Sequence, residues 1–207
     1  MAFDRAHWED SYSKKTPEEL SWYEPRPQRS LELIQATGLG QNARILDVGG
    51  GASSLAAHLL GMGYTDLTVA DISPAAIAHA IAELGSDAAR VTWVEADVRS
   101  HDFRRRYDLW HDRAVFHFMV SVADREGYLD VLRRTLRPGG HVIMGTFGPQ
   151  GPTQCSGLPV QRYGAKDLVS VLGGDFALAS ASLTTHRTPS GACQQFLYAH
   201  FFRRPAG

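Results

Sequence analysis

The chain has 207 residues, of which 43% are hydrophobic, and it carries a formal net charge of −1. This length fits one domain with a full hydrophobic core, and the near-zero charge excludes a general attraction to nucleic acid or to an anionic membrane surface. The first residues lack the basic-then-apolar pattern of a signal peptide, and no apolar run approaches the roughly 20 residues that span a bilayer. We therefore expect a cytoplasmic protein, a monomer or a homodimer, without nucleic-acid or membrane partners.

Metal binding is not expected from the cysteines and histidines. Cys155 and Cys193 lie far apart and lack the spacing of a zinc site or of a disulfide framework. The nine histidines show no metal-ligand spacing either. We expect two reduced thiols and no metal ion.

The elements begin with an N-terminal segment, residues 1–27, that is rich in aromatic side chains. Trp8, Tyr12, Trp22 and Tyr23 lie in a polar stretch that proline interrupts, and no conventional core helix is expected there. Aromatic side chains in such a stretch need an apolar surface to cover. Either they fold over a bound ligand as a lid, or they only pack on the following helix.

Residues 28–147 alternate between strands and helices, and the runs are short and apolar, as in a buried parallel sheet. The predicted strands are Ala43–Gly49, Asp66–Ile72, Arg90–Asp97, Tyr107–Asp112 and His141–Phe147. The predicted helices are Gln28–Thr37, Ser53–Gly61, Pro74–Leu84 and Asp124–Leu136. Ser73 is the expected N-cap of the third helix, and residues 137–140, RPGG, are expected to stop the fourth helix with a tight turn.

The last 60 residues, 148–207, do not continue this alternation of strands and helices. Two strand-like runs, Phe176–Thr188 and Cys193–Arg204, flank the turn residues Pro189–Gly191, which is typical of a hairpin. We predict an α/β fold with a doubly wound sheet, mostly parallel, whose last strand is antiparallel and lies in this C-terminal hairpin. Its parts are the lid segment 1–27, a ligand-binding core 28–147 and the region 148–207, within one domain.

Three consecutive glycines follow the first strand, where an open α/β sheet binds its ligand. Gly49, Gly50 and Gly51 let a ligand lie against the backbone. A nicotinamide or flavin nucleotide is the main rival ligand, but its fingerprint requires a third spaced glycine where this chain has Ser54, and the P-loop pattern is absent. Asp47 would repel a pyrophosphate and suits a ligand with an ammonium group.

Two further carboxylates follow at the ends of the next two strands. Asp71 lies about 20 residues after the glycines, where an acidic side chain accepts hydrogen bonds from ribose hydroxyls. Asp97 can accept from an adenine amino group, with the backbone N–H of Val98 beside it. A ligand with an amine, a ribose and an adenine but no phosphate matches this set, and S-adenosylmethionine is such a ligand.

The successive motifs ILDVGGGASSLA, VADISPAAIAHA, VEADV, YDLWHDRAVFHF and LRPGGHVIM resemble those of the class I S-adenosylmethionine-dependent methyltransferases. The resemblance spans roughly Leu31 to Phe147 and implies a Rossmann-like, seven-stranded sheet. GASSLA and DISPAAIAHA are similar to the group that includes the citrate synthase and elongation-factor lysine methyltransferases. That group has Asp-Lys-Gly after the fourth strand, whereas residues 111–114 here are His-Asp-Arg-Ala, closer to small-molecule enzymes.

The resemblance implies a place for each cofactor-binding residue. Gly49–Gly51 pack against the methionine part of the cofactor, and Asp47 organises the amine. Asp71, with Ile72, holds the ribose, and Asp97 with Val98 holds the adenine. Trp22 belongs to the lid, and His111 lies near the sulfonium.

Methyl transfer is a direct displacement that requires alignment of the nucleophile and exclusion of water. A thiolate or a neutral amine attacks unaided, whereas a hydroxyl requires a proton acceptor, for which His111, Asp112 and His117 are the candidates. We expect a small-molecule nucleophile, with protein lysine as the alternative acceptor. A nicotinamide-dependent oxidoreductase and a cofactor-binding protein without activity are more distant alternatives.

The acceptor pocket is expected to involve residues 148–207. The loop after Phe147 leaves the sheet at its carboxyl edge with Cys155, Arg162 and Tyr163, and a parallel strand would bring His186 to the same edge. Cys155 and Cys193 would then meet at the acceptor pocket, unless both only fill space in the core.

Overall fold

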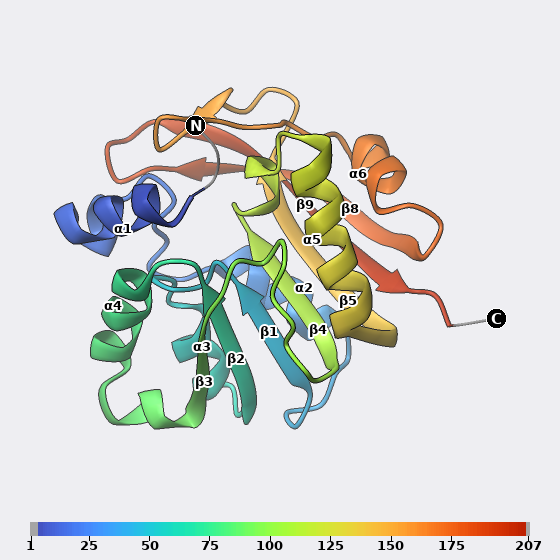
Figure 1. The fold of residues 1–207 in the computed structure, drawn as a ribbon, viewed down its shortest axis with the longest axis horizontal. Coiled ribbons are helices and arrows are strands. Elements are labelled where there is room, and N and C mark those ends of the chain that lie inside the picture. Colours follow the sequence, from blue (N-terminus) through green and yellow to red (C-terminus); the bar gives the residue numbers. More distant parts are fainter. Residues whose placement is uncertain (1–3, 206–207) are drawn as a thin grey trace.

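The computed structural model describes residues 4–205, and its centre is a seven-stranded sheet with the order β3-β2-β1-β4-β5-β9-β8 (Figure 1). The strands are β1 (Arg44–Val48), β2 (Asp66–Asp71), β3 (Val91–Glu95), β4 (Tyr107–Arg113), β5 (Leu136–Phe147), β8 (Phe176–Arg187) and β9 (Cys193–Arg203). Strands β1 to β5 are parallel, and β9 lies antiparallel between β5 and β8. The predicted sheet and its C-terminal hairpin are confirmed.

The strands form because their side chains are buried on both faces of the sheet, as expected of parallel strands between helices. Four of the five residues of β1 and five of the six of β2 are buried. In the register, Asp47 lies beside His111 and Val48 beside Ala70. The carboxyl ends of β1, β2, β3 and β4 therefore meet at one edge.

Helices cover both faces of the sheet, with α5 in front of it in Figure 1 and α2 behind it. Their bounds are α2 (Gln28–Ala36), α3 (Leu55–Gly61), α4 (Pro74–Leu84), α5 (Val122–Thr135) and α6 (Ala165–Leu172), with 3-10 helices at η1 (Pro17–Glu19), η2 (Gly85–Arg90) and η3 (Phe116–Phe118). The Ser73 hydroxyl accepts a hydrogen bond from the Ala76 N–H and caps α4, as predicted. Helix α6 was not predicted from the sequence.

The N-terminal segment differs from the prediction because it contains a helix, α1 (Arg5–Lys14). The Asp4 carboxylate accepts from the His7 N–H and caps the helix. Trp8 and Tyr12, four residues apart, lie on one face and are buried. Pro17 follows the helix rather than interrupting it, so the prediction of no core helix was wrong.

Residues 136–140 also differ from the prediction, because the structure includes them in β5 instead of in a tight turn. Leu136 pairs with Tyr107, and the next pair is Leu109 with His141, so the register shifts between them. Gly139 has a φ of +73°, which allows the chain to bulge. Leu136 is fully buried, and this burial anchors the start of the strand.

A short hairpin of β6 (Gln154–Cys155) and β7 (Leu158–Pro159) follows β5. Ser156 and Gly157 turn it with positive φ values of +49° and +76°. The Ser156 hydroxyl lies 3.4 Å from Nε2 of His7, so this hairpin touches α1. The two segments, almost 150 residues apart in sequence, meet above the carboxyl edge of the sheet.

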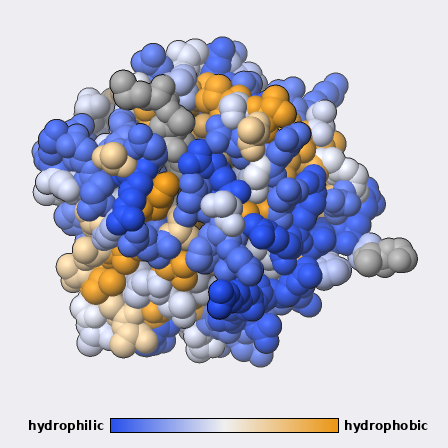
Figure 2. All heavy atoms as spheres, viewed as in Figure 1, coloured by the Kyte–Doolittle hydropathy of each residue, from blue (hydrophilic) through white to orange (hydrophobic). Residues whose placement is uncertain are grey.

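On the face drawn in Figure 2, hydrophobic residues form small separate patches among hydrophilic ones. None of the helices formed by residues 4–205 combines the length and the apolar character that a membrane span requires. The large aromatic side chains of α1 are turned inward, toward the sheet edge.

Candidate active site

Two adjoining cavities lie at the carboxyl edge of the sheet, in the place predicted for the ligand. The first has about 580 Å³ of space free of protein atoms and the second about 530 Å³, with the solvent at their mouths included. Four residues line both cavities: Tyr12, Trp22, Gly49 and Arg113. One elongated ligand can therefore occupy the two cavities together.

The glycine loop is packed against two carboxylates and a neighbouring strand end. A Cβ atom on Gly49, whose φ is +66°, would lie 2.1 Å from the Val115 side chain. A Cβ on Gly50 would lie 2.1 Å from Oδ2 of Asp47, and one on Gly51 would lie 2.8 Å from Oδ2 of Asp71. Gly49 is favoured by its positive φ and by Val115, and Gly50 and Gly51 by the close approach of the two acidic side chains.

Asp47 has one satisfied oxygen and one orphaned oxygen. Its Oδ1 accepts a hydrogen bond of 2.6 Å from Nδ1 of His111, while Oδ2 is buried without a hydrogen-bond partner. Asp47 lines the second cavity. A buried, unpaired carboxylate oxygen is costly unless a ligand donates to it, so this atom marks a site for a hydrogen-bond donor or a cation.

His111 has both ring nitrogens engaged, since its Nε2 lies 2.8 Å from the Ser30 hydroxyl and its Nδ1 bonds to Asp47. The side chain is buried and borders the second cavity. This arrangement fits a residue that orients Asp47. The sequence had suggested His111 as a free proton acceptor, and this arrangement does not fit that role.

Asp71 lines the first cavity with both oxygens held by backbone groups. Oδ1 accepts from the Ser73 N–H at 2.9 Å and Oδ2 from the Gly51 N–H at 3.0 Å. Each carboxylate oxygen can accept a second hydrogen bond, so the side chain still has room for two ligand hydroxyls. Burial raises the pKa of Asp71 to about 6.

The structure brings Val98 and Ile72 into the first cavity but not the side chain of Asp97. Asp97 instead binds Arg99, with 2.6 Å between Oδ2 and Nη2. Burial raises the pKa of Asp97, and the hydrogen bonds from Arg99 outweigh this and lower it. Arg99 donates to both oxygens of this carboxylate, and the adenine contact through Asp97 stays a prediction.

Asp112 and His117, the other predicted catalytic residues, line neither cavity. The Asp112 carboxylate accepts from the N–H groups of Val115 and Phe116 and from the Tyr128 hydroxyl at 2.6 Å. His117 is fully buried, and its Nδ1 accepts from the Phe147 N–H at 3.3 Å. Burial, and then the nearby charge of Arg113, lowers the pKa of His117 to about 3. Both residues hold the backbone after β4 in place.

Arg113 and Glu24 are site residues that the sequence reasoning missed. Arg113 ends β4 and lines both cavities, and its Nη2 lies 2.9 Å from Oε1 of Glu24. Nε donates to the Tyr198 hydroxyl at 2.9 Å, and Nη1 donates to the Trp22 carbonyl at 2.7 Å. The position of Arg113 at the carboxyl end of a buried strand was the signal that could have identified it.

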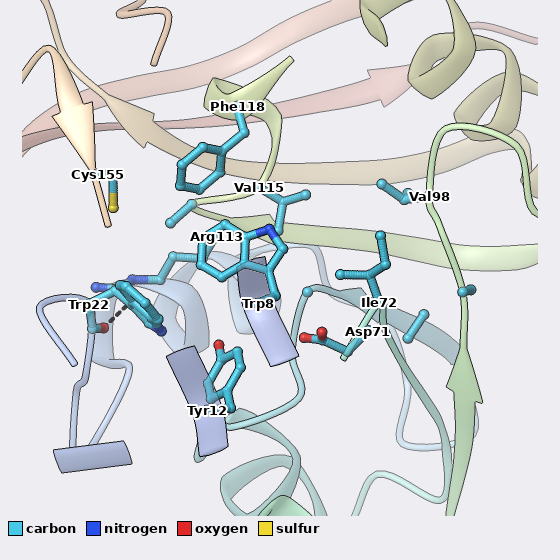
Figure 3. Close-up of a pocket in the computed structure, with 14 residues that line it drawn as sticks. Trp8, Tyr12, Trp22, Asp71, Ile72, Val98, Arg113, Val115, Phe118 and Cys155 are labelled. Carbon is cyan, nitrogen blue, oxygen red and sulfur yellow. Dashed lines mark hydrogen bonds between the residues drawn. The ribbon is translucent and has the colours of Figure 1, made fainter. Parts of the chain in front are cut away.

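Aromatic side chains and one cysteine close the first cavity (Figure 3). Trp8, Tyr12 and Trp22 of the N-terminal segment line it together with Phe118 and Cys155. Burial raises the pKa of the Cys155 thiol to about 12, so it is neutral. Tyr23 lines the second cavity.

The structure separates the two cysteines and the other residues predicted on the acceptor side. Cys193 is exposed at the start of β9 and lines neither cavity, so the predicted meeting of the two thiols does not occur. Arg162 and Tyr163 also lie outside both linings. His186 does reach this edge, where it contacts Glu24 at 3.2 Å. Within residues 4–205, no group of three or more His, Cys, Asp or Glu side chains could hold a metal ion.

A family model described as a methyltransferase domain matches residues 45–140, which include the glycine loop, Asp47, Asp71 and His111. The match covers just under half of the chain. Nodulation protein S of Rhizobium tropici is 27% identical to this chain over 151 residues, which cover 71% of this chain and 59% of that protein. The tRNA U34 carboxymethyltransferase of Chromohalobacter salexigens is 27% identical over 146 residues, 67% of this chain and 42% of that protein. The chain thus spans less than two thirds of the length of either relative.

Solved structures share the fold around the methyltransferase domain. One, from a study of the conversion of a disulfide bond into a thioacetal group during echinomycin biosynthesis, has a TM-score of 0.79 with 21% identity and covers 98% of this chain and 94% of its own. The N-methyltransferase NodS of Bradyrhizobium japonicum, solved with S-adenosylhomocysteine, has a TM-score of 0.70 with 20% identity, and the match covers 94% of this chain and 97% of that chain. A Burkholderia thailandensis 1,6-didemethyltoxoflavin-N1-methyltransferase has a TM-score of 0.74 with 22% identity, and the match covers 97% of this chain and 87% of that chain. At these identities the likeness is one of fold.

Proposed function

We propose that this protein is an S-adenosylmethionine-dependent methyltransferase that acts on a small-molecule nucleophile. The observation that carries the proposal is the orphaned Oδ2 of Asp47 beside the glycine loop, in a residue that lines the second cavity. A ligand amine here would satisfy a buried carboxylate oxygen that otherwise has no hydrogen-bond partner.

The remaining residues fit the other parts of this cofactor. Asp71 has acceptor capacity left for two ribose hydroxyls, and Ile72 and Val98 form an apolar slot suited to adenine. The bound cofactor supplies an electrophilic methyl group on a sulfonium. Tyr12, Trp22, Gly49 and Arg113, shared by both cavities, would surround the point where the nucleoside and the amino acid meet.

The rival ligands fit less well. The pyrophosphate of a nicotinamide dinucleotide would lie against the glycine loop, where Asp47 repels anions. The finer likeness to lysine methyltransferases has no support among the relatives described above, and one solved neighbour is named for a small molecule, 1,6-didemethyltoxoflavin.

We propose that three parts of the chain have different roles in binding and catalysis. Residues 1–27 act as the lid, and Trp8, Tyr12 and Trp22 in the cavity lining support this assignment. Residues 28–147 hold the cofactor, with Asp47, Gly49, Gly50, Gly51, Asp71, Ile72 and Val98 as its binding residues. Residues 148–207 supply the acceptor side through Cys155 and the strands that carry His186 and Tyr198.

The test combines binding with turnover. Calorimetry should show binding of S-adenosylhomocysteine, while NADH should give neither binding heat nor thermal stabilisation. Methyl transfer from labelled S-adenosylmethionine to a cell extract, separated into small molecules and protein, should label the small-molecule fraction. Binding of NADH instead of S-adenosylhomocysteine would refute the proposal, and label confined to protein would refute the small-molecule acceptor.

A further inference from the structure

The first cavity has two sides that differ in chemistry (Figure 3). Asp71, Ile72 and Val98 lie on one side and Trp22, Arg113 and Cys155 on the other, with Trp8 between them. The proposed function, on which this inference rests, places the nucleoside on the first side. The second side, formed by Trp8, Trp22, Arg113, Phe118 and Cys155 and here named the acceptor wall, then faces the methyl acceptor.

The acceptor wall contains no group that can take a proton at neutral pH. Arg113 is a cation whose pKa is raised despite its burial, because Tyr198 and Glu24 surround it. Cys155 is a neutral thiol. The other three side chains are aromatic and do not ionise. A hydroxyl acceptor would therefore lack a general base, whereas a thiolate or a neutral amine needs none.

Arg113 is the charged side chain of the acceptor wall, and Glu24 and His186 lie next to it in turn. Glu24, which pairs with Arg113, also lies 3.2 Å from Nδ1 of His186, and Nε2 of His186 lies 2.7 Å from the Ser21 carbonyl. Both ring nitrogens of His186 thus lie against oxygen atoms of the N-terminal segment. Arg113 therefore supplies the positive charge on the acceptor wall.

Arg113 also has donors to spare. A guanidinium has five N–H bonds, and contacts to Tyr198, Trp22 and Glu24 do not use all of them. Nη2 is buried without a hydrogen bond of good geometry. Cys155, which is neutral, and His117, whose lowered pKa keeps it neutral, also lie near it, and Asp47 and His111 line the second cavity with it. Besides Glu24, an anionic ligand atom in the cavity would accept from the N–H bonds of Arg113 that these contacts leave over.

We propose that the methyl acceptor is a small thiol that binds as its thiolate, with Arg113 as the counter-ion. The thiol loses its proton to water on ionisation. A lone pair of the thiolate sulfur forms the new bond to the methyl carbon, and the electron pair of the breaking carbon–sulfur bond stays on the former sulfonium sulfur. Two neutral thioether sulfurs result.

The aromatic surroundings favour this exchange of charges. Trp8 packs edge-on against Trp22 and Phe118, with ring centroids 5.8 and 5.0 Å apart, so the wall is apolar. Cancelling opposite charges is most favourable where the local dielectric is low. An amine acceptor would instead create a new cation beside Arg113.

Three acceptors of the same shape test the proposal: phenylmethanethiol, benzylamine and benzyl alcohol, each with labelled S-adenosylmethionine. We expect the thiol to have a kcat/KM at least about tenfold above the amine, which corresponds to one charge-assisted interaction, and no transfer to the alcohol. Equal or faster turnover of benzylamine would overturn the thiol assignment.

Variants of Arg113 test the counter-ion. Loss of the cation in Arg113→Gln should shift the pH midpoint of kcat/KM for phenylmethanethiol upward by about one unit, since an adjacent cation favours the ionised thiol. Arg113→Lys should retain most of the wild-type profile. The control Arg105→Gln removes a cation that pairs with Asp66, at the opposite end of β4, and should not shift it. An unshifted profile in Arg113→Gln would exclude Arg113 as the counter-ion.

A binding measurement gives a second readout that does not depend on turnover. With S-adenosylhomocysteine bound, phenylmethanethiol should quench the fluorescence of the wall tryptophans, and its affinity should rise with pH in the wild type but less in Arg113→Gln. A protein that binds S-adenosylhomocysteine but neither binds nor methylates the thiol overturns the acceptor assignment alone. Failure to bind S-adenosylhomocysteine overturns the proposed function instead.

Discussion

Oδ1 of Asp47 lies 2.6 Å from Nδ1 of His111, while the other carboxylate oxygen, Oδ2, is buried without a hydrogen-bond partner. His111 in turn contacts the Ser30 hydroxyl at 2.8 Å. Asp47 and His111 are 64 positions apart in the sequence, and His111 and Ser30 are 81 apart, so the fold alone brings the three residues together. These contacts hold the Asp47 side chain in place and leave its Oδ2 atom for a ligand.

The first prediction concerns this carboxylate. Asp47→Asn should weaken S-adenosylhomocysteine binding about tenfold or more, because it removes a charged hydrogen-bond acceptor. Binding of 5′-methylthioadenosine, which has the nucleoside but no amine, should change less than about twofold. Calorimetry with both ligands measures the difference. An equal loss for both ligands would show that Asp47 does not face the amine.

A second prediction concerns Asp71. Asp71→Ala should raise the dissociation constant of S-adenosylhomocysteine about tenfold or more, through loss of the ribose contacts. Asp66→Asn is the matched control, since Asp66 begins the same strand and pairs with Arg105 away from the cavities. Normal binding by Asp71→Ala would mean that the ribose lies elsewhere.

The raised pKa of Asp71, about 6, adds a pH dependence to this binding. The ionised carboxylate is the better acceptor, so wild-type affinity should fall as pH drops below about 6. The same raised pKa means that the folded protein holds a proton which the unfolded chain releases above about pH 4. Its contribution to stability is therefore complete below pH 4 and lost as pH rises through 6.

His117 should act on stability in the opposite direction. Its pKa of about 3 in the folded protein lies below the ordinary value, so the unfolded chain binds a proton that the folded protein does not. The stability that depends on neutral His117 is present above about pH 6.5 and falls by about 1.4 kcal/mol per pH unit toward pH 3. Urea unfolding of the wild type and of His117→Gln, compared across this range, should show this slope in their difference. A constant difference would mean that His117 is charged in the folded protein.

A fourth prediction tests the lid. Glu9 of α1 accepts from the Ser73 hydroxyl at 2.8 Å and from the Ala75 N–H at 3.2 Å, at the start of α4. Glu9→Ala should release α1 and raise the dissociation constant of S-adenosylhomocysteine about threefold to tenfold. Asp10→Ala is the control, because Asp10 pairs with Lys14 within the same helix. If both variants bind like the wild type, the position of α1 does not govern cofactor binding.

The two cysteines should react differently with iodoacetamide. Cys193 is exposed and should be alkylated first, without loss of S-adenosylhomocysteine binding. Cys155 is buried with a pKa of about 12 and should react slowly, and more slowly still with the ligand present. Mass spectrometry of peptides gives both rates. Faster alkylation of Cys155 than of Cys193 would show that the first cavity opens widely in solution.

The sequence by itself determined the parallel core of the sheet, the glycine loop and the carboxylates at the strand ends. These features are local, because each apolar run, each cap and each glycine reflects the physical needs of a few neighbouring residues. The C-terminal hairpin followed from the same kind of signal. Asp47 and Asp71 could be placed at one edge because parallel strands end together.

The tertiary structure alone decided which polar side chains face the cavities. His111, Asp112 and His117 look equivalent in the sequence, yet His111 supports Asp47 while the other two hold the backbone after β4. Arg113, beside them, is exposed to both cavities because Glu24 and Tyr198 come to it from distant segments. Whether a polar side chain faces a cavity or bonds to the backbone depends on partners from distant segments. Long-range packing supplies these partners, and no local pattern encodes them.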